Sequence, residues 1–121
     1  MKQKRFSPLK NLMHSIHGFI EVSKNEKPMQ IELMTAAILT IVLFLIDISF
    51  VSKLLLFASL VFVLLVEILN SAIERVVDLV TLEYHELAKH AKDAASAGVL
   101  LALIIVGILW IVVIGSEKGY L

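Results

Sequence analysis

Cysteine is absent from this sequence, and glycine, proline and tryptophan are scarce, with five, two and one residues respectively. Without cysteine there is no disulfide, no thiolate metal site and no cysteine nucleophile. Five glycines leave no room for a glycine-rich phosphate loop, and G-x-x-x-x-G-K-[ST] does not occur. The motifs H-E-x-x-H and G-x-S-x-G are also missing, which argues against zinc proteolysis and hydrolase-fold chemistry.

Net charge is missing as well, because 11 basic residues balance 11 acidic ones. Without a basic field, we expect no binding to nucleic acid. Apolar residues are in excess, at 59% of the chain against 18% charged residues, and the mean hydropathy is +0.90. A soluble domain of 121 residues would need more polar residues to cover its surface. We therefore expect an integral membrane protein with one domain over residues 1–121.

The first predicted helix covers about residues 8–24 and lies on the membrane surface. Ser7 followed by Pro8 favours a helix start, because serine can cap free N–H groups and proline at the first helical position loses no hydrogen bond. The apolar residues that follow recur every three or four positions: Leu9, Leu12, Met13, Ile16, Phe19 and Ile20. A polar hinge over residues 23–32 follows, in which Pro28 is well placed to begin the next helix.

Three further helices are predicted to cross the membrane, over about residues 30–48, 53–80 and 92–116. The first contains 14 uncharged residues in a row and the third contains 23. The second continues past its charge-free part and is expected to emerge from the bilayer. The fold class is therefore an all-α integral membrane protein with three transmembrane helices and an N-terminal amphipathic surface helix. Trp110 lies too deep for an interfacial anchor, so we expect it to pack against another chain or a lipid.

Basic residues indicate the orientation. Only Lys53 and Lys118 fall on one side of the predicted bundle. The other nine fall on the opposite side: Lys2, Lys4, Arg5, Lys10, Lys24, Lys27, Arg75, Lys89 and Lys92. Since basic residues are retained in the cytoplasm, the N-terminus and the polar connection at 81–93 are expected to face it.

Polar residues interrupt the second spanning segment along one helical stripe, at Glu67, Asn70, Ser71, Glu74 and Asp78. At ~1.5 Å per residue, Glu67 is expected roughly 10 Å inside the cytoplasmic interface and Glu74 near the interface itself. Hydrogen bonds between helices explain Asn70 and Ser71 about as well as a function does. An ionisable group at the depth of Glu67 predicts a function.

More carboxylates are expected near the same interface: Glu26, Glu74, Asp78, Glu83, Glu86 and Asp93. Carboxylates with few sulfur or imidazole competitors suit Mg²⁺, which usually accompanies phosphates. A solvated charged loop is the better explanation for most of them, Glu86 and Lys89 in particular. His14 and His17 are better explained as headgroup or solvent contacts than as metal ligands.

The stretch VEILNSAIERVVDLV (66–80), followed by EYHELAKHAKDAASAGVLL (83–101), resembles the signature region of the small prokaryotic diacylglycerol kinases. The pattern E-x-x-N-S-A-I-E with the downstream A-K-D is highly specific, and the resemblance covers most of the chain. It implies an enzyme that transfers the γ-phosphate of ATP, with Mg²⁺ as cofactor, to the hydroxyl of diacylglycerol, giving phosphatidic acid for phospholipid recycling. It also implies a homotrimer with active sites shared between subunits, on the cytoplasmic side of the bacterial inner membrane.

The resemblance further implies roles for individual residues. Glu67 matches the proposed general base, and Glu26 and Glu74 match ligands of the divalent metal. Nucleotide binding is implied for His14, Glu26, Glu74, Glu83, Tyr84, His85, Lys92 and Asp93. For Glu67, Asn70 and Ser96, the resemblance implies positions that line the site on the side of the lipid substrate.

The N-terminal segment departs from the family pattern. An Arg and a Tyr are common there, where this chain places Ser7 and His14. After a small shift, either Arg5 or Lys10 supplies the missing positive charge.

Three other functions remain open. Relatives in Gram-positive bacteria phosphorylate undecaprenol with what looks like the same site, although EYHELAKHAKD resembles the diacylglycerol branch more closely. A small proton-coupled transporter subunit would use Glu67 as a relay, but it leaves Lys92 and the interfacial carboxylates unexplained. A non-catalytic membrane scaffold predicts that Mg-ATP does not protect the protein from unfolding.

Overall fold

The computed structural model describes residues 5–121, and over that range it is built from four helices with short connections. The helices are α1 (Pro8–Asn25), α2 (Lys27–Leu45), α3 (Phe50–Val80) and α4 (Glu86–Glu117). Because α2, α3 and α4 are each long and apolar enough to cross a membrane, the predicted fold class is confirmed. The first four residues, which include Lys2 and Lys4 of the charge argument and the start of the predicted domain, lie outside the described residues.

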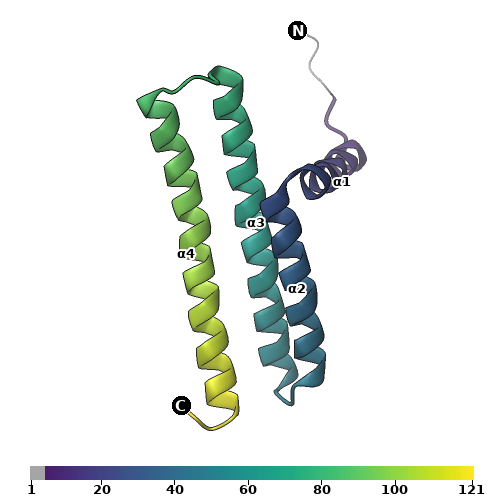
Figure 1. The fold of residues 1–121 in the computed structure, drawn as a ribbon. Coiled ribbons are helices and arrows are strands. Elements are labelled where there is room, and N and C mark those ends of the chain that lie inside the picture. Colours follow the sequence, from purple (N-terminus) through teal and green to yellow (C-terminus); the bar gives the residue numbers. More distant parts are fainter. Residues whose placement is uncertain (1–4) are drawn as a thin grey trace.

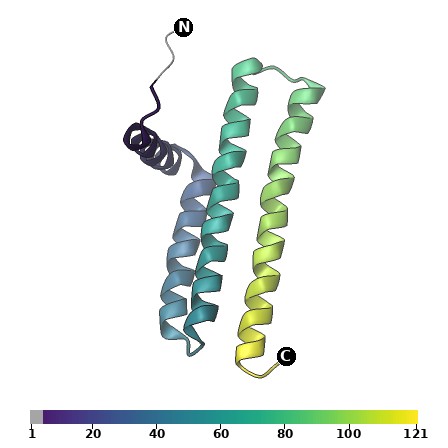
Figure 2. The ribbon, with the colours of Figure 1, turned by 180° about the vertical axis from the view of Figure 1, so that it is seen from behind.

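Helix α3 lies between α2 and α4 and packs against both, as Figures 1 and 2 show from opposite sides. Helix α1 leaves the bundle steeply where α2 begins, and it contacts α2 and α3. Beyond the level of α1, α3 and α4 continue to their connection, so the two ends of the bundle are different (Figure 1). We call the end with α1 and the α3–α4 connection the polar end.

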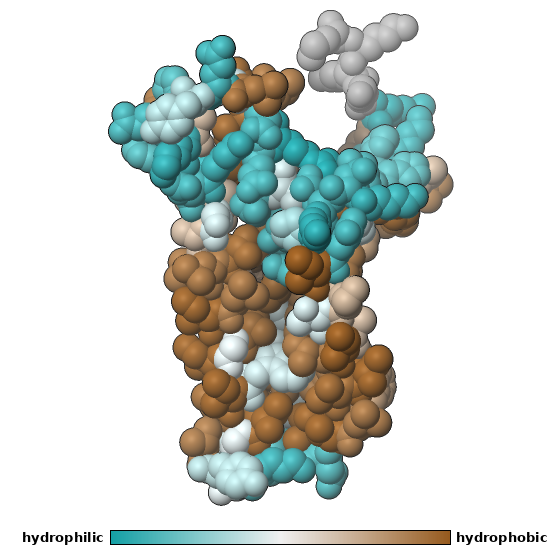
Figure 3. Space-filling view, viewed as in Figure 1, coloured by the Kyte–Doolittle hydropathy of each residue, from teal (hydrophilic) through white to brown (hydrophobic). Residues whose placement is uncertain are grey.

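Hydrophobic side chains form a broad band on the face shown in Figure 3, with polar residues above and below it. The 19 residues of α2 span about 28 Å at a rise of ~1.5 Å per residue, close to the ~30 Å hydrocarbon layer. The 31 residues of α3 span about 46 Å by the same rise. Helix α3 therefore extends well beyond the apolar band. The part of α3 outside the band belongs to the polar end.

The hinge between α1 and α2 is one residue long, Glu26, which has an extended backbone (φ −108°, ψ 114°). The N–H of Glu26 donates to the carbonyl of Val22 and ends α1. The predicted polar hinge over residues 23–32 is therefore almost entirely helical. At the start of α1, Ser7 is the N-cap residue but makes no capping hydrogen bond through its side chain, so Pro8 explains the start better than Ser7 does.

Several helix boundaries differ from the predicted ones. Helices α2 and α3 begin at Lys27 and Phe50, about three residues before their predicted starts, and two further differences have a local cause. Helix α2 ends at Leu45 instead of residue 48, because the chain turns extended at Ile46. Helix α4 begins at Glu86 instead of residue 92, because the Nδ1 atom of His85 accepts the N–H of Leu87 at 3.1 Å and caps the helix. A capping histidine has no clear sequence signature, whereas Ser, Thr, Asp and Asn do.

A small core closes the end opposite the polar end. Leu43, Ile48 and Leu56 are buried there, and Leu109 and Trp110 of α4 pack against them. The indole N–H of Trp110 donates to Ser59 Oγ at 3.0 Å. Trp110 thus packs partly against its own chain, and its contact with another chain or a lipid stays a prediction.

Candidate active site

The polar stripe of α3 runs from buried to exposed toward the polar end. Glu67 and Ser71 are buried, with 3% and 2% of their surfaces exposed. Asn70 and Glu74 are half-buried, and Asp78 is exposed. The amide of Asn70 donates to Glu74 Oε1 at 3.5 Å, the long limit of a hydrogen bond. Helical spacing therefore places a protected carboxylate and a more accessible one on the same side of α3, two turns apart.

Two oxygen acceptors beside Glu67 lack hydrogen-bond donors. Glu32 of α2 and Asn70 both lie next to Glu67. The Oε2 atom of Glu32 and the Oδ1 atom of Asn70 are buried without a partner. Because unpartnered buried acceptors are costly, this arrangement favours a donor group that comes from outside the chain. Sequence reasoning missed Glu32 as a site residue, although an acid inside the predicted span 30–48 was a usable signal.

Glu32 also lines an apolar groove of about 300 Å³ inside the hydrophobic band. The groove is formed by residues of α2, α3 and α4, with Thr35 and Leu39, Leu60 and Val63, and Leu103 among them. Its volume is enough for part of an acyl chain. A lipid in this groove would have a carboxylate at its edge.

A polar cavity of about 380 Å³ lies at the α3–α4 connection. It brings together five of the residues predicted to bind the nucleotide: Glu83, Tyr84, His85, Lys92 and Asp93. The ammonium group of Lys92 donates to Asp78 Oδ1 at 2.6 Å, which joins α3 to α4. Lys89 pairs with Asp93 at 2.6 Å. Both cations of the cavity are therefore paired with carboxylates of their own chain.

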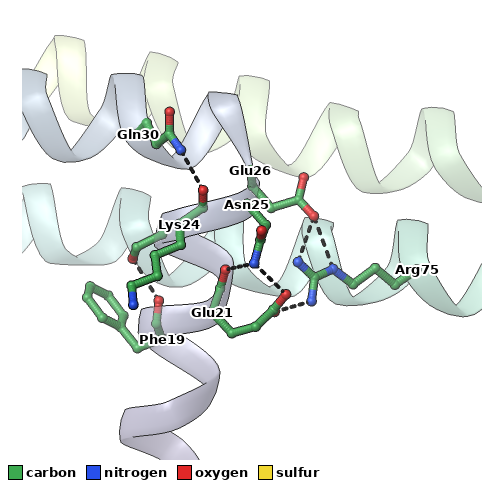
Figure 4. Close-up of polar contacts among 8 residues, drawn as sticks. Phe19, Glu21, Lys24, Asn25, Glu26, Gln30 and Arg75 are labelled. Carbon is green, nitrogen blue, oxygen red and sulfur yellow. Dashed lines mark hydrogen bonds and ion pairs between the residues drawn. The ribbon is translucent and has the colours of Figure 1, made fainter.

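Arg75 connects α3 to the hinge between α1 and α2 (Figure 4). Its Nε and Nη2 atoms donate to Glu26 Oε1 at 3.0 and 2.8 Å, and its Nη1 atom donates to Glu21. Asn25 also donates to Glu21, at 2.9 Å. The hydrogen bond from Arg75 is the main reason why the pKa of Glu21 lies below its usual value of 4.5. Sequence reasoning missed Arg75 and Glu21, because residues 54 positions apart give no local signal.

Other predicted site residues lie outside the polar cavity. His14 is exposed on α1, which lies on the side of α3 away from α4 (Figures 1 and 2). Ser96 is exposed on α4. Glu26 and Glu74 are not in the cavity lining either, although both lie within electrostatic reach of Glu67.

The donor set fits Mg²⁺ when the ion arrives with phosphates. Among residues 5–121, no group of three acidic, histidine or cysteine side chains is arranged to hold a metal alone. Glu26 and Glu74 each provide one half-buried carboxylate. Mg²⁺ usually takes one or two protein carboxylates together with substrate phosphates and water, which matches two such groups.

The fold and the site define an α-helical membrane protein with a carboxylate at the edge of an apolar groove and a polar cavity at the end of the bundle. Residues 13–114 match the family described as prokaryotic diacylglycerol kinase, and the chain belongs to that family.

Individual relatives agree with this assignment. The chain is 48% identical to a diacylglycerol kinase of Escherichia coli (strain K12) over 73 residues, and this match spans 60% of each chain. It is 40% identical to the diacylglycerol kinase of Haemophilus influenzae over 97 residues, covering 80% of this chain and 82% of the relative. The undecaprenol kinase of Bacillus subtilis is 34% identical over 96 residues, covering 79% and 78% of the two chains.

Proposed function

We propose that this protein is a lipid kinase that transfers the γ-phosphate of Mg-ATP to the hydroxyl of diacylglycerol and forms phosphatidic acid. The observation that supports the proposal most strongly is the environment of Glu67, a buried carboxylate flanked by unpartnered acceptors on Glu32 and Asn70. A lipid hydroxyl that donates to Glu67 would enter a region where acceptors are in excess and donors are lacking. Phosphatidic acid formation returns diacylglycerol to phospholipid metabolism.

On the lipid side, Glu67 acts as the general base. The lipid chain occupies the apolar groove, its hydroxyl donates to Glu67, and Asn70 orients the headgroup. Ser96, on the exposed surface of α4, contacts the lipid nearer to the water. A positioned base of this kind contributes about 10²–10⁴-fold to a rate.

On the nucleotide side, the polar cavity holds ATP with Glu83, Tyr84, His85, Lys92 and Asp93. Lys92 releases Asp78 and turns to the phosphates. Glu26 and Glu74 would hold Mg²⁺, which would supply neutralisation of the phosphate charge. His14 is proposed to contact the nucleotide from α1, which requires the nucleotide to extend from the cavity toward the hinge.

Phosphoryl transfer exchanges one P–O bond for another. The lipid oxygen forms a bond to the γ-phosphorus while the bond between that phosphorus and the β,γ-bridging oxygen breaks. The hydroxyl proton passes to Glu67, and ADP leaves with the bridging oxygen. Such reactions depend mainly on positioning and on neutralising charge. Helix α3 serves this purpose, because one rigid element carries both Glu67 and Glu74.

We also propose a homotrimer with active sites shared between neighbouring subunits, in the bacterial inner membrane with the polar end in the cytoplasm. Large apolar side chains at the polar end support an interface there, because Leu79, Val80, Leu82 and Leu87 are between 71% and 88% exposed. These residues lie at the polar end, close in sequence to the charged residues Asp78, Glu83 and Glu86. Native mass spectrometry in detergent tests the trimer.

The substrate is tested by offering diacylglycerol and undecaprenol together in mixed micelles with radiolabelled Mg-ATP. Identity favours diacylglycerol, at 40% for the Haemophilus influenzae enzyme against 34% for the undecaprenol kinase over nearly equal lengths. Label on diacylglycerol supports the proposal, and label on undecaprenol keeps the reaction and changes the substrate. Label on neither would contradict a kinase, and proton flux without ATP consumption would then favour a transporter subunit.

A further inference from the structure

Arg75 satisfies a carboxylate that the proposed function assigns to the divalent cation. Its guanidinium group makes two hydrogen bonds to the same oxygen, Glu26 Oε1, at 3.0 and 2.8 Å. The other oxygen of Glu26 points away from Arg75 (Figure 4). Glu26 is 27% exposed, so a cation from the water can reach it.

The same guanidinium group has a second anion within reach. Glu21, one turn before the hinge, accepts from Nη1 of Arg75 and is held in place by Asn25. A planar guanidinium has five N–H donors and can bind two carboxylates at once or shift its bonds from one to the other. Arg75 therefore keeps a partner after Glu26 is withdrawn from it.

We propose that Arg75 is a resident counter-cation of Glu26, which competes with the incoming divalent cation, and that Glu21 retains Arg75 when the cation takes Glu26. The inference rests on the proposed function for the role of Glu26. Arg75 is a positioning residue in this mechanism, because it acts through Glu26 and does not touch the substrates.

Charge arithmetic gives the direction of the effect. A guanidinium beside Glu26 repels a divalent ion at the same carboxylate, and the repulsion falls with water and salt. Removing the Arg75 charge should tighten cation binding roughly five- to twenty-fold. Removing the Glu21 charge leaves Arg75 with Glu26 alone and should weaken cation binding by a few fold.

The test uses Mn²⁺, which paramagnetic resonance detects directly, titrated into the full chain in detergent micelles with a non-hydrolysable ATP analogue. Arg75→Gln should bind Mn²⁺ more tightly than wild type and Glu21→Gln more weakly. In the double variant, Glu21→Gln should add no effect, because Glu21 acts through Arg75. Lys24→Gln is the matched control, since Lys24 is an exposed cation near the hinge and makes no ion pair among residues 5–121.

Three outcomes would overturn the inference: unchanged or weaker Mn²⁺ binding in Arg75→Gln, an equal gain in Lys24→Gln, or a full Glu21 effect in the double variant. The last two would indicate a general field effect instead of competition. If Arg75→Gln does not fold, Glu21→Gln alone still tests the inference, because unchanged binding in it would contradict the role of Glu21.

Lipid phosphorylation by the wild type, measured in parallel, separates this inference from the proposed function. If the wild type phosphorylates lipid normally and the variants bind Mn²⁺ with the wild-type affinity, only this inference is overturned and the proposed function stands. If the wild type phosphorylates no lipid, but Arg75→Gln binds Mn²⁺ more tightly and Glu21→Gln more weakly, the kinase activity would be overturned. The competition at Glu26 would still stand.

Discussion

The indole N–H of Trp110 donates to Ser59 Oγ at 3.0 Å, and the Ser59 hydroxyl donates in turn to the carbonyl of Leu56 at 2.6 Å. These two linked hydrogen bonds join α4 to α3 within the apolar band, where water does not compete for them. Leu56 is fully buried at the same point. The two helices are thus joined through a hydroxyl whose donor and acceptor functions are both used.

Replacing Trp110 with Phe, Ser59 with Ala, or both should give a measurable coupling energy. Hydrogen bonds between membrane helices contribute about 0.6 kcal/mol on average and up to ~1.7 kcal/mol. We expect coupling in this range from unfolding of the four proteins in detergent. Additive losses would mean that the hydrogen bond does not stabilise the bundle.

Acid should remove the stabilising effect of Glu21. The pKa of Glu21 is lowered from 4.5 in the folded protein, chiefly by the hydrogen bond from Arg75. The unfolded chain therefore takes up this proton at higher pH than the folded chain does, and folding is favoured above 4.5 and loses this contribution as pH falls through the lowered pKa.

The measurement is the difference in unfolding free energy between wild type and Glu21→Gln as a function of pH. The difference should be constant near neutral pH and should narrow below 4.5. In an Arg75→Gln background the narrowing should disappear. A constant difference at all pH values would show that the ion pair does not stabilise the fold.

His85 should show two separable roles. As the N-cap of α4 it accepts from Leu87, and losing such a cap costs about 1 kcal/mol. His85→Ala should therefore lower the unfolding free energy by about that amount, whereas His85→Asn should keep it, because Asn is a good cap. If His85 also contacts ATP, both variants raise KM for ATP. An unchanged KM in His85→Asn would leave only the capping role.

Glu117 should anchor the C-terminal end of α4. It accepts hydrogen bonds from Ser49 and Ser52, and Lys118 donates to the carbonyl of Asp47 at 2.8 Å. Glu117→Ala should speed hydrogen exchange of the amides from Gly115 to Leu121 and leave lipid phosphorylation unchanged. Unchanged exchange would mean that the backbone hydrogen bonds from Tyr120 and Leu121 to the carbonyl of Gly115 are sufficient.

The number of helices and the polar stripe of α3 were predictable from the sequence because both depend on local patterns. Runs of uncharged residues predict the spans, and the 3.6-residue period places Glu67 and Glu74 on one side. The start of α2 at Lys27 lies next to the Pro28 that predicted it, whereas the start of α4 was placed too late because its cap is a histidine.

The partners of the site residues could not be predicted. Lys92 pairs with Asp78 across two helices, and Arg75 reaches Glu21 and Glu26 from α3. Such contacts depend on how the helices pack against one another in space, which no local residue pattern encodes. The resemblance supplied the candidate residues, and in the fold the cavity at the α3–α4 connection collects five of those predicted to bind the nucleotide, without His14.

The base at Glu67 is tested most directly by comparing the initial rate of diacylglycerol phosphorylation in wild type and Glu67→Gln, with Glu117→Gln as the control substitution at the opposite end. Gln keeps the shape and removes the proton acceptor. We expect a loss of about 10²–10⁴-fold in kcat, with unchanged thermal stability and unchanged KM for ATP, and no loss in Glu117→Gln. Turnover by a folded Glu67→Gln protein at the wild-type rate would contradict the role of Glu67 as the base.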